Sequence, residues 1–450
     1  MTLPITLFLS LLIISFFLVN KSSCENGLIF LWGAIFVIPS LILSIGVISF
    51  LNVYTLLIII FSFFFFYNTV YRKAFVSFYK KYAKQLIFLI IAYLFLIIFS
   101  ETVPFKEQLY DCIRELLQIL IIIETFIIAK SNDSFTIHLC KILFILILCN
   151  IVYSCVFEIV FRMNYAGAPL YVLLGMNYNE YVVDMINVQR GIFDFRLQSI
   201  YGHPISLGQY YLLIVPIFLC KYIQLSKNMK LFTVFALSLC IVLSGTRGAI
   251  FPLFLILGLY AINNQGSRIY NKLLFIPLLI LLYVFIPLQS QRNIDKYCDS
   301  LITYIQFWDD DKQARSEITG SSLSMRLDQM SAAQREIKDN KLCGKGRTYR
   351  EYYQNKNGQL HPELLGYESF ILLKLVEQGW IGLFLFVFLI IYIYIILRRE
   401  RCNAYILTLL FIAYFSSTLM TGIRPFSFLI LGMSGIIIAT SNKSRNIILS

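Results

Sequence analysis

The residues best suited to chemistry in this sequence are arginines in short turns between apolar segments. Arg247 lies in Ser-Gly-Thr-Arg-Gly, Arg424 lies in Thr-Gly-Ile-Arg-Pro, and Arg196 precedes His203 in a third polar stretch. Arginine presents a planar fork that makes bidentate contacts with phosphate, which lysine cannot match. The set indicates an anionic, phosphate-bearing ligand at the mouth of a bundle. Contact with lipid headgroups and pairing with nearby carboxylates are the alternatives.

A long polar segment, Leu288–Gly366, adds Arg315, Arg326, Arg335, Arg347 and Arg350. Loops longer than about 15 residues are usually functional or disordered. Ser324–Asn340 reads as a helix capped by Ser324, with one face formed by Leu327, Met330, Ala333, Gln334 and Ile337. Glycines in Lys341–Gly346 then end it. Arg326 opposes the helix dipole in the first turn, so it serves either a ligand or simply the surface.

Glu368 begins the next helix. One face of that helix is predicted to carry Glu368, Leu372, Leu375, Gly379 and Gly382, whose spacing is helical. The two glycines would let a neighbouring helix approach closely. Glu368 at the end of this face is a candidate general base, with capping or a salt bridge as the alternative. His203 and His361 are further base candidates, and each also fits a simple polar residue near the membrane surface.

Metal and cofactor chemistry is not expected. The ten cysteines show no CxxC spacing, and Asp309–Asp311 reads as a solvated acidic turn. Cys298 and Cys343 share the long polar segment, where they form either a disulfide or two unpaired thiols. Nucleic acid is not expected as a partner because the basic residues are dispersed between apolar spans rather than gathered in one patch.

The positioning elements must be membrane helices. The chain is 58% hydrophobic and 14% charged, whereas soluble domains carry roughly 25% charged residues. Spans of roughly 20 apolar residues predict an all-α polytopic membrane protein with about 12–13 transmembrane helices and one large, partly helical outer loop. Leu28–Tyr71 holds two spans if it breaks near Leu51-Asn52, which puts the amino terminus outside, or one span, which puts it inside.

The basic cluster Arg72–Lys84 is assigned to the cytoplasm by the positive-inside rule. Counting spans from there places the long polar segment outside. The predicted organisation is a single integral membrane domain: helices in 1–287 with an outer segment 161–202, a large outer loop 288–366, and further helices in 367–450. Glu124 and Lys141 lie inside adjacent apolar segments, where they either form an ion pair or act as a proton relay.

The sequence resembles the O-antigen ligase and O-antigen polymerase superfamily of bacterial membrane glycosyltransferases. Ligases of that family carry a pattern like His-Asn-x-x-Leu-x-x-Leu-x-Glu-x-Gly-x-x-Gly, which here reads Glu368-Ser369-x-x-Leu372-x-x-Leu375-x-Glu377-x-Gly379-x-x-Gly382. Arg326 followed by Lys341-Leu342-Cys343-Gly344-Lys345-Gly346 resembles Arg…Pro-Leu-x-Gly-x-Gly, and Ser244–Ala249 resembles Ser-x-Ser-Arg-Gly-Ala. Arg196 through His203-Pro204 resembles an Arg…Asn-Pro element, with Ser199 where glycine is common.

The resemblance implies a multi-pass protein of the bacterial inner (cytoplasmic) membrane with its large loop in the periplasm. The donor would be a glycan on undecaprenyl pyrophosphate, held by Arg196, Arg247 and Arg326 without a metal. The acceptor would be lipid A–core or another glycan, with membrane lipid around the site. Glu368 stands where the ligases have histidine, which favours a repeat-unit polymerase as the first alternative to a ligase.

Other classes remain open from the sequence. A lipid-linked glycan flippase or transporter predicts internal repeats and short loops on both sides, which are not evident. A structural or sensory protein would have no use for the outer arginines.

The predicted substrate-binding residues are Arg196, as above, together with Arg424, His203 and His361.

Overall fold

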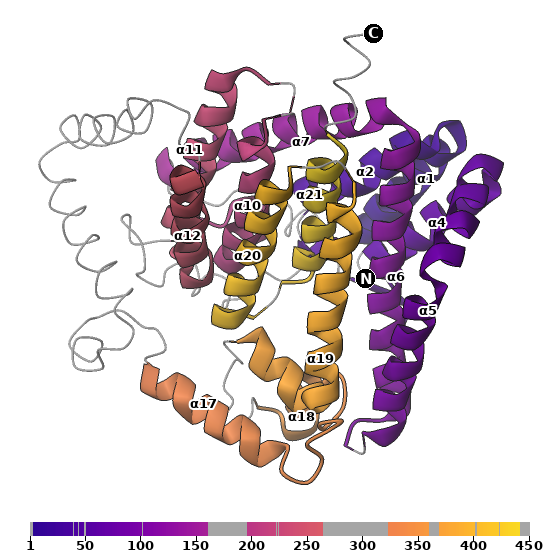
Figure 1. The fold of residues 1–450 in the computed structure, drawn as a ribbon, viewed down its shortest axis with the longest axis vertical. Helices are drawn as coiled ribbons and strands as arrows, with labels where there is room; N and C mark the ends of the chain where they lie inside the picture. Colours follow the sequence, from indigo (N-terminus) through magenta and orange to yellow (C-terminus); the bar gives the residue numbers. More distant parts are fainter. Residues whose placement is uncertain are drawn as a thin grey trace, which may run out of the picture.

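The chain forms an all-α membrane protein, as predicted. The computed structural model describes residues 3–38, 40–43, 45–48, 51–100, 102–160, 196–221, 223, 225–263, 323–359, 369–400, 403–422 and 424–441. These residues are almost entirely helical, and the strands β1 (Gly46–Ile48) and β2 (Leu51–Asn52) form a small antiparallel hairpin. Most of the long helices run side by side in one bundle (Figure 1).

The first helices are α1 (Leu3–Ser22), α2 (Cys24–Val37), α3 (Ser40–Leu43), α4 (Val53–Tyr67), α5 (Thr69–Phe99), α6 (Phe105–Ser131) and α7 (Asp133–Tyr153), which continues as the π-helix η1 (Ser154–Val160). Asparagine side chains begin several of them. The Asn52 oxygen accepts from the Thr55 N–H at 2.8 Å, and Asn132 accepts from Ser134 at 3.1 Å, which satisfies donors that a helix start leaves open. The apolar run Leu28–Tyr71 is therefore divided near Leu51-Asn52, with most of α2 before the break and α4 after it.

The later elements are the 3₁₀ turn η2 (Ser199–Tyr201), α10 (Pro204–Leu219), α11 (Lys227–Leu243), α12 (Arg247–Asn263), α17 (Leu323–Glu336), α18 (Tyr349–Asn357), α19 (Phe370–Arg398), α20 (Ala404–Met420) and α21 (Ser427–Thr440). Every residue of α21, and nearly every residue of α10, is buried. Helices that are apolar all round belong in a core. α10 and α21 pack against each other and against α20 at the centre of the bundle.

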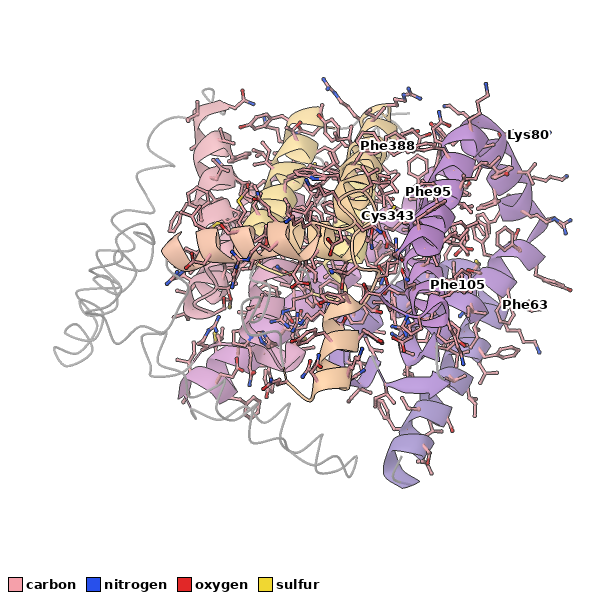
Figure 2. All side chains as sticks on the ribbon, turned by 90° about the horizontal axis from the view of Figure 1, so that it is seen from below. Phe63, Lys80, Phe95, Phe105, Cys343 and Phe388 are labelled. Atoms are coloured by element: carbon pink, nitrogen blue, oxygen red, sulfur yellow. The ribbon has the colours of Figure 1, made fainter. Side chains whose placement is uncertain are left out.

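The outer surface of the bundle is apolar. Phe63, Phe95 and Phe105 project from its edge and are 65%, 41% and 54% exposed (Figure 2). In the described part of the chain, three helices have the length and apolarity to cross a membrane: α5, Ser134–Val160 and α19. Several shorter apolar helices pack among them. The last part of the predicted helical region 1–287, residues 264–287, lies outside the described residues.

Helix α19 is broken at Gly379, where φ is 61° and ψ is −164°. The prediction of one continuous helical face from Glu368 to Gly382 is therefore wrong. The first part of α19 is tilted against the rest (Figure 1). Gly379 does permit a close approach, but the neighbour is a loop segment and not a helix.

Helices α17 and α18 lie across one end of the bundle, which is called the loop end below (Figures 1 and 2). α17 (Leu323–Glu336) begins one residue before the predicted helix Ser324–Asn340 and ends four residues before its predicted end. The predicted face is confirmed only in part. Ala333 and Ile337 are buried as predicted, whereas Leu327 and Met330 are exposed. The orientation of α17 is set by the contacts of its second half with α19. The apolar pattern of its sequence does not predict that orientation.

The predicted ion pair between Glu124 and Lys141 is absent. Glu124 is fully buried and accepts a hydrogen bond from Ser62 Oγ at 3.1 Å, whereas Lys141 is exposed. A hydroxyl from α4 thus partners the carboxylate. The two charges lie on adjacent helices but point to different surroundings.

Candidate functional site

Arg196 holds the turn that ends α11. Its Nε donates to the Ser244 carbonyl at 2.9 Å, and its Nη2 donates to the Gly245 carbonyl and to Thr246 Oγ1, each at 3.2 Å. The last carbonyls of a helix have no partner within it, so the guanidinium satisfies them and complements the negative end of the helix dipole. Arg196 is 8% exposed. Its described contacts shape the turn that carries Arg247.

A strained turn follows Arg196. Ser199 has φ 52°, a left-handed conformation that disfavours side chains other than glycine. This explains why glycine is expected at the position. Both oxygens of the buried Glu158 carboxylate accept from the Ser199 N–H, at 2.9 and 3.0 Å. Sequence reasoning missed Glu158 because only the fold brings η1 against this turn.

Arg247 is the first residue of α12 and is 8% exposed. Gly245, two residues earlier, has φ 57°, so the turn needs its glycine. At Gly248 an added Cβ would overlap the side chain of Thr421. The Arg247 turn therefore packs directly against the end of α20, where the turn carrying Arg424 begins.

His203 and Arg424 meet from distant parts of the chain. Arg424 Nη2 lies 3.0 Å and 2.9 Å from the two ring nitrogens of His203. His203 Nδ1 also accepts the Ile205 N–H at 3.1 Å and so caps α10. Burial, then the charges of Arg424 and Arg196, lower the pKa of His203 to about 2. An imidazole that stays neutral and uses Nδ1 as a cap fits a supporting role for Arg424 better than that of a base.

Gln209 joins the same turns. Its amide nitrogen donates to Thr421 Oγ1 at 2.8 Å and to the Gly422 carbonyl at 2.9 Å. Its amide oxygen accepts from the Arg424 N–H at 3.1 Å and from Ser427 Oγ at 2.8 Å. Thr246 Oγ1 donates to the Pro204 carbonyl at 3.1 Å. These bonds fasten the polar residues of one site, the arginine site, which comprises Arg196, His203, Arg247 and Arg424.

Other predicted site residues are only partly described. The backbone of Arg326 lies in the first turn of α17, and its side chain is outside the description. Glu368 and His361 lie outside the described residues. The Phe370 N–H, two residues after Glu368, donates to the Thr421 carbonyl at 3.3 Å. The start of α19 thus meets the turn that also packs against Gly248.

The segment Lys341–Gly346 docks into the break of α19. The N–H groups of Trp380 and Ile381 donate to the carbonyls of residues 341 and 342, at 3.0 and 3.1 Å. In return, the N–H groups of residues 345 and 346 donate to the carbonyls of Val376 and Glu377, at 2.9 and 2.8 Å. The open groups on both sides of the break are thereby satisfied.

Two glycines make this docking possible. Gly344 and Gly379 have φ 70° and 61°, and an added Cβ on Gly344 would lie 2.6 Å from the Gly379 nitrogen. The glycine motifs noted in the loop and in the helix therefore belong to one contact. Cys343 in this segment is a buried, free thiol, while Cys298 lies outside the described residues.

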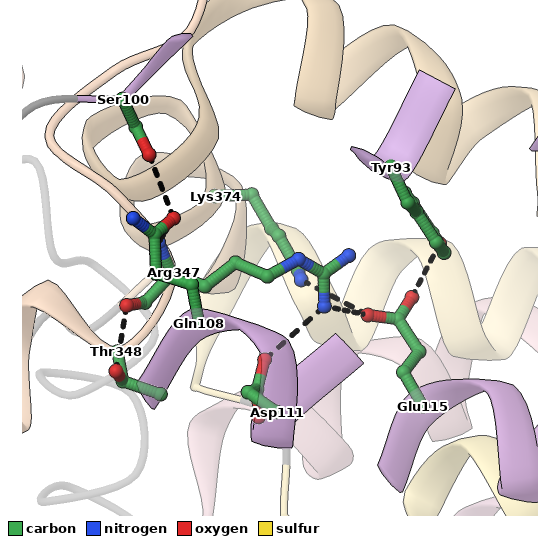
Figure 3. Close-up of polar contacts among 8 residues, drawn as sticks. All are labelled: Tyr93, Ser100, Gln108, Asp111, Glu115, Arg347, Thr348 and Lys374. Carbon is green, nitrogen blue, oxygen red and sulfur yellow. Dashed lines mark hydrogen bonds and ion pairs between the residues drawn. The ribbon is translucent and has the colours of Figure 1, made fainter. Parts of the chain in front are cut away.

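A second charged cluster lies beside the docked segment. Arg347 is buried and pairs with Asp111 and Glu115 of α6 (Figure 3). Sequence reasoning counted Arg347 among the loop arginines without giving it a role. Its partners are more than 200 positions away in the sequence, so no local signal pointed to the pairing.

Metal ligation finds no support in the described ranges, where no group of three or more His, Cys, Asp and Glu residues is arranged to hold an ion. Asp309–Asp311 lies outside those ranges. The chemistry available at the arginine site is the binding of negative charge by guanidinium groups.

Comparison with known proteins identifies one family. Residues 232–387 match the family model described as O-antigen ligase. The match confirms the resemblance to the O-antigen ligase and polymerase superfamily for this part of the chain, which contains Arg247, Arg326 and Glu368. It supports a membrane glycosyltransferase of the ligase or polymerase type. No curated protein matches the chain.

Proposed function

We propose that this O-antigen ligase-like chain transfers a glycan from undecaprenyl pyrophosphate to an acceptor hydroxyl at the loop end of the bundle. That end would face the periplasm from the bacterial inner membrane. The acceptor would be the lipid A–core in a ligase or a second glycan in a polymerase. The donor is a lipid whose pyrophosphate lies at the membrane surface, and the arginine site lies at the ends of apolar helices.

One observation carries the proposal. Three turns that each carry an arginine adjoin one another: Arg196 bonds the turn before Arg247, and Gln209 and His203 hold the turn of Arg424. Arg196 donates to carbonyl oxygens and a hydroxyl, and Arg424 lies against the imidazole of His203. Preorganised donors aimed at developing negative charge are a large source of catalysis. A pyrophosphate leaving group is the ligand that this chemistry favours.

The reaction balances without a metal. The acceptor hydroxyl oxygen attacks the anomeric carbon, and the bond from that carbon to the phosphate oxygen breaks. Undecaprenyl pyrophosphate leaves with the bonding electrons, and Arg247 and Arg326 stabilise its added charge. Glu368 accepts the hydroxyl proton. Arg196 orients the Arg247 turn, and His203 orients Arg424 on the pyrophosphate or the glycan.

A polymerase is the closest alternative. Glu368 stands where the ligase pattern has histidine, so the group that meets the acceptor differs chemically. The chain therefore departs from the ligase pattern at the position proposed to meet the acceptor, and this departure favours a polymerase that joins glycan repeats. A flippase or transporter is the second alternative, and it would leave the loop arginines without a catalytic role.

The test is the surface glycan profile of a deletion strain. The strain is complemented with the wild-type chain, Arg247→Ala, Arg326→Ala or Glu368→Gln, with Arg335→Ala as the control because Arg335 is an exposed arginine of the same helix α17. We expect the first three variants to lose transfer by about 100-fold or more and the control to restore it. Restoration by all variants would overturn the assignments.

The deletion strain itself separates the alternatives. Long chains that accumulate on undecaprenyl pyrophosphate above a bare lipid core identify a ligase. Single repeats attached in place of a ladder identify a polymerase. Lipid-linked glycan retained on the cytoplasmic side identifies a flippase and overturns the proposed transfer.

A further inference from the structure

Arg347 ties the docked segment to helix α6. Its Nη1 lies 3.1 Å from Asp111 Oδ2 and 2.6 Å from Glu115 Oε2. The guanidinium lies over the ring of Tyr93, 4.4 Å from its centroid. The side chain is 1% exposed. A guanidinium so completely buried is stabilised only by matched partners, so these contacts depend strongly on one another.

The partners of Arg347 come from α5 and α6, and Glu115 has a further partner from α19 (Figure 3). Tyr93 of α5 donates from its hydroxyl to Glu115 Oε1 at 2.6 Å. Lys374 of α19 lies 3.8 Å from Glu115 Oε2. Glu115 is therefore shared by α5, α19 and the loop, and Arg347 completes its surroundings. Removal of the guanidinium would leave both carboxylates of α6 without their main counter-charge.

The backbone of Arg347 is held as well. Its N–H donates to Gln108 Oε1 at 3.1 Å, and the Ser100 hydroxyl donates to the same oxygen at 2.7 Å. The Gln108 amide nitrogen donates to the Val103 carbonyl at 2.8 Å. Side chain and main chain together fix the residue that directly follows the docked segment.

The same cluster anchors the end of α17. Ala332 and Ala333 pack in a small core with Val103, Tyr349 and Val376. The Tyr349 hydroxyl donates to Glu336 Oε2 at 3.1 Å, and the Asn340 amide donates to the Phe99 carbonyl at 2.9 Å. The second half of α17 is thus attached where Arg347 is attached, and its first turn carries Arg326.

Because α17 is anchored at its second half, a small rotation there displaces its first turn. Arg326 precedes Glu336 by ten positions, which is about 15 Å along a helix. A tilt of about 10° about the anchored end moves the Arg326 backbone by about 2–3 Å on that geometry. Misplacement of a reacting or charge-stabilising group by about 1 Å lowers a rate by about 100-fold. Small errors at the Arg347 cluster therefore become large errors at Arg326.

We propose that Arg347 is a positioning residue for Arg326. Its pairing with Asp111 and Glu115 holds Lys341–Gly346 in the break of α19 and thereby sets the direction of α17. This role rests on the proposed function for its catalytic consequence, because Arg326 is the group that meets the pyrophosphate. Arg347 itself touches neither donor nor acceptor.

A double-mutant cycle measures the coupling. Transfer is followed in proteoliposomes with lipid-linked glycan extracted from the deletion strain, for Arg347→Met, Arg326→Lys and the double variant. We expect Arg347→Met to lower the rate by about 100-fold in the parent and by less than about 3-fold beside Arg326→Lys, since groups that act as a unit are non-additive. If the fold-loss of rate in the double variant equals the product of the fold-losses in the two single variants, the positioning role is overturned.

Cys343 gives a readout that does not need activity. Burial raises the pKa of its thiol, so an impermeant maleimide should label it slowly in a chain where it is the sole cysteine. We expect Arg347→Met to speed labelling by about tenfold or more and the exposed-residue control Lys338→Met to leave it unchanged. Arg347→Lys, which keeps the charge but loses the fork, serves if the methionine variant does not accumulate. Unchanged labelling in both Arg347 variants overturns the proposal.

The two proposals fail differently. Full activity of Arg326→Lys and Arg326→Ala removes Arg326 from the proposed function and, with it, the catalytic purpose of Arg347. Impaired Arg326 variants with multiplicative losses leave the proposed function intact and overturn only the positioning role.

Discussion

Two arginine clusters at the same end of the molecule treat positive charge in opposite ways. Arg347 is enclosed by Asp111, Glu115 and the face of Tyr93, so its charge is cancelled inside the protein. Arg424 is held by a neutral imidazole, and Arg196 is held by carbonyls and a hydroxyl. Charge matched within the fold stabilises the fold. The described contacts of Arg196 and Arg424 are of a different kind, and this difference supports the proposed binding of an anionic ligand at the arginine site.

The largest effect that separates the clusters concerns stability. Arg347→Met should lower the free energy of unfolding by about 3 kcal/mol or more, because it removes the cation paired with both Asp111 and Glu115 and leaves only Lys374 beside Glu115. Arg424→Met should cost about 1 kcal/mol, because it removes a hydrogen bond to a neutral ring. Denaturant unfolding in detergent measures both. Equal losses would mean that the two clusters are alike.

The next largest effect concerns the contact between Gly379 in α19 and the segment Lys341–Gly346. Gly379→Ala should lower the free energy of unfolding by about 2 kcal/mol, since φ there is 61° and the added Cβ would overlap the Leu342 carbonyl. Gly258→Ala is the matched control, because nothing lies near an added Cβ in α12. Thermal unfolding of both variants decides the matter. A loss of unfolding free energy in Gly379→Ala no larger than that in the control would show that the break in α19 tolerates rearrangement.

The smallest effect is a pH dependence at the arginine site. The unfolded imidazole of His203 binds a proton below its ordinary pKa of 6.5, whereas the folded one, with a pKa of about 2, does not. Stability contributed by the site is therefore complete above pH 6.5 and is lost as pH falls. Between pH 7 and pH 5 the loss is up to about 2 kcal/mol.

His203→Asn isolates that contribution, since asparagine can also cap α10. The difference in free energy of unfolding between pH 7 and pH 5 should be smaller in the variant than in the wild type. An identical pH dependence in both proteins would show that His203 titrates normally, and the cationic character of the site would then be weaker than argued.

Much of the arrangement was readable in the chain. Apolar runs predicted the helices, and the break near Leu51-Asn52 was visible as a polar interruption. The serine at position 199 was noticed as a departure from glycine, and the structure supplies the reason, a left-handed turn braced by Glu158. The pairing of Glu124 with Lys141 was wrong because two charges on adjacent helices need not face each other.

The sequence by itself determined the class of the protein and the types of residue that can do its chemistry. Hydropathy depends only on neighbouring residues, so the apolar helices can be predicted directly from the order of residues along the chain. Arginines in turns can bind anions wherever those turns lie. The tertiary structure shows what the sequence does not, namely that Arg347 is paired with carboxylates whereas Arg196 contacts carbonyls and a hydroxyl. Arg196, Arg247, Arg347 and Arg424 look alike in sequence, and they differ because burial and counter-charge come from helices far away in the chain.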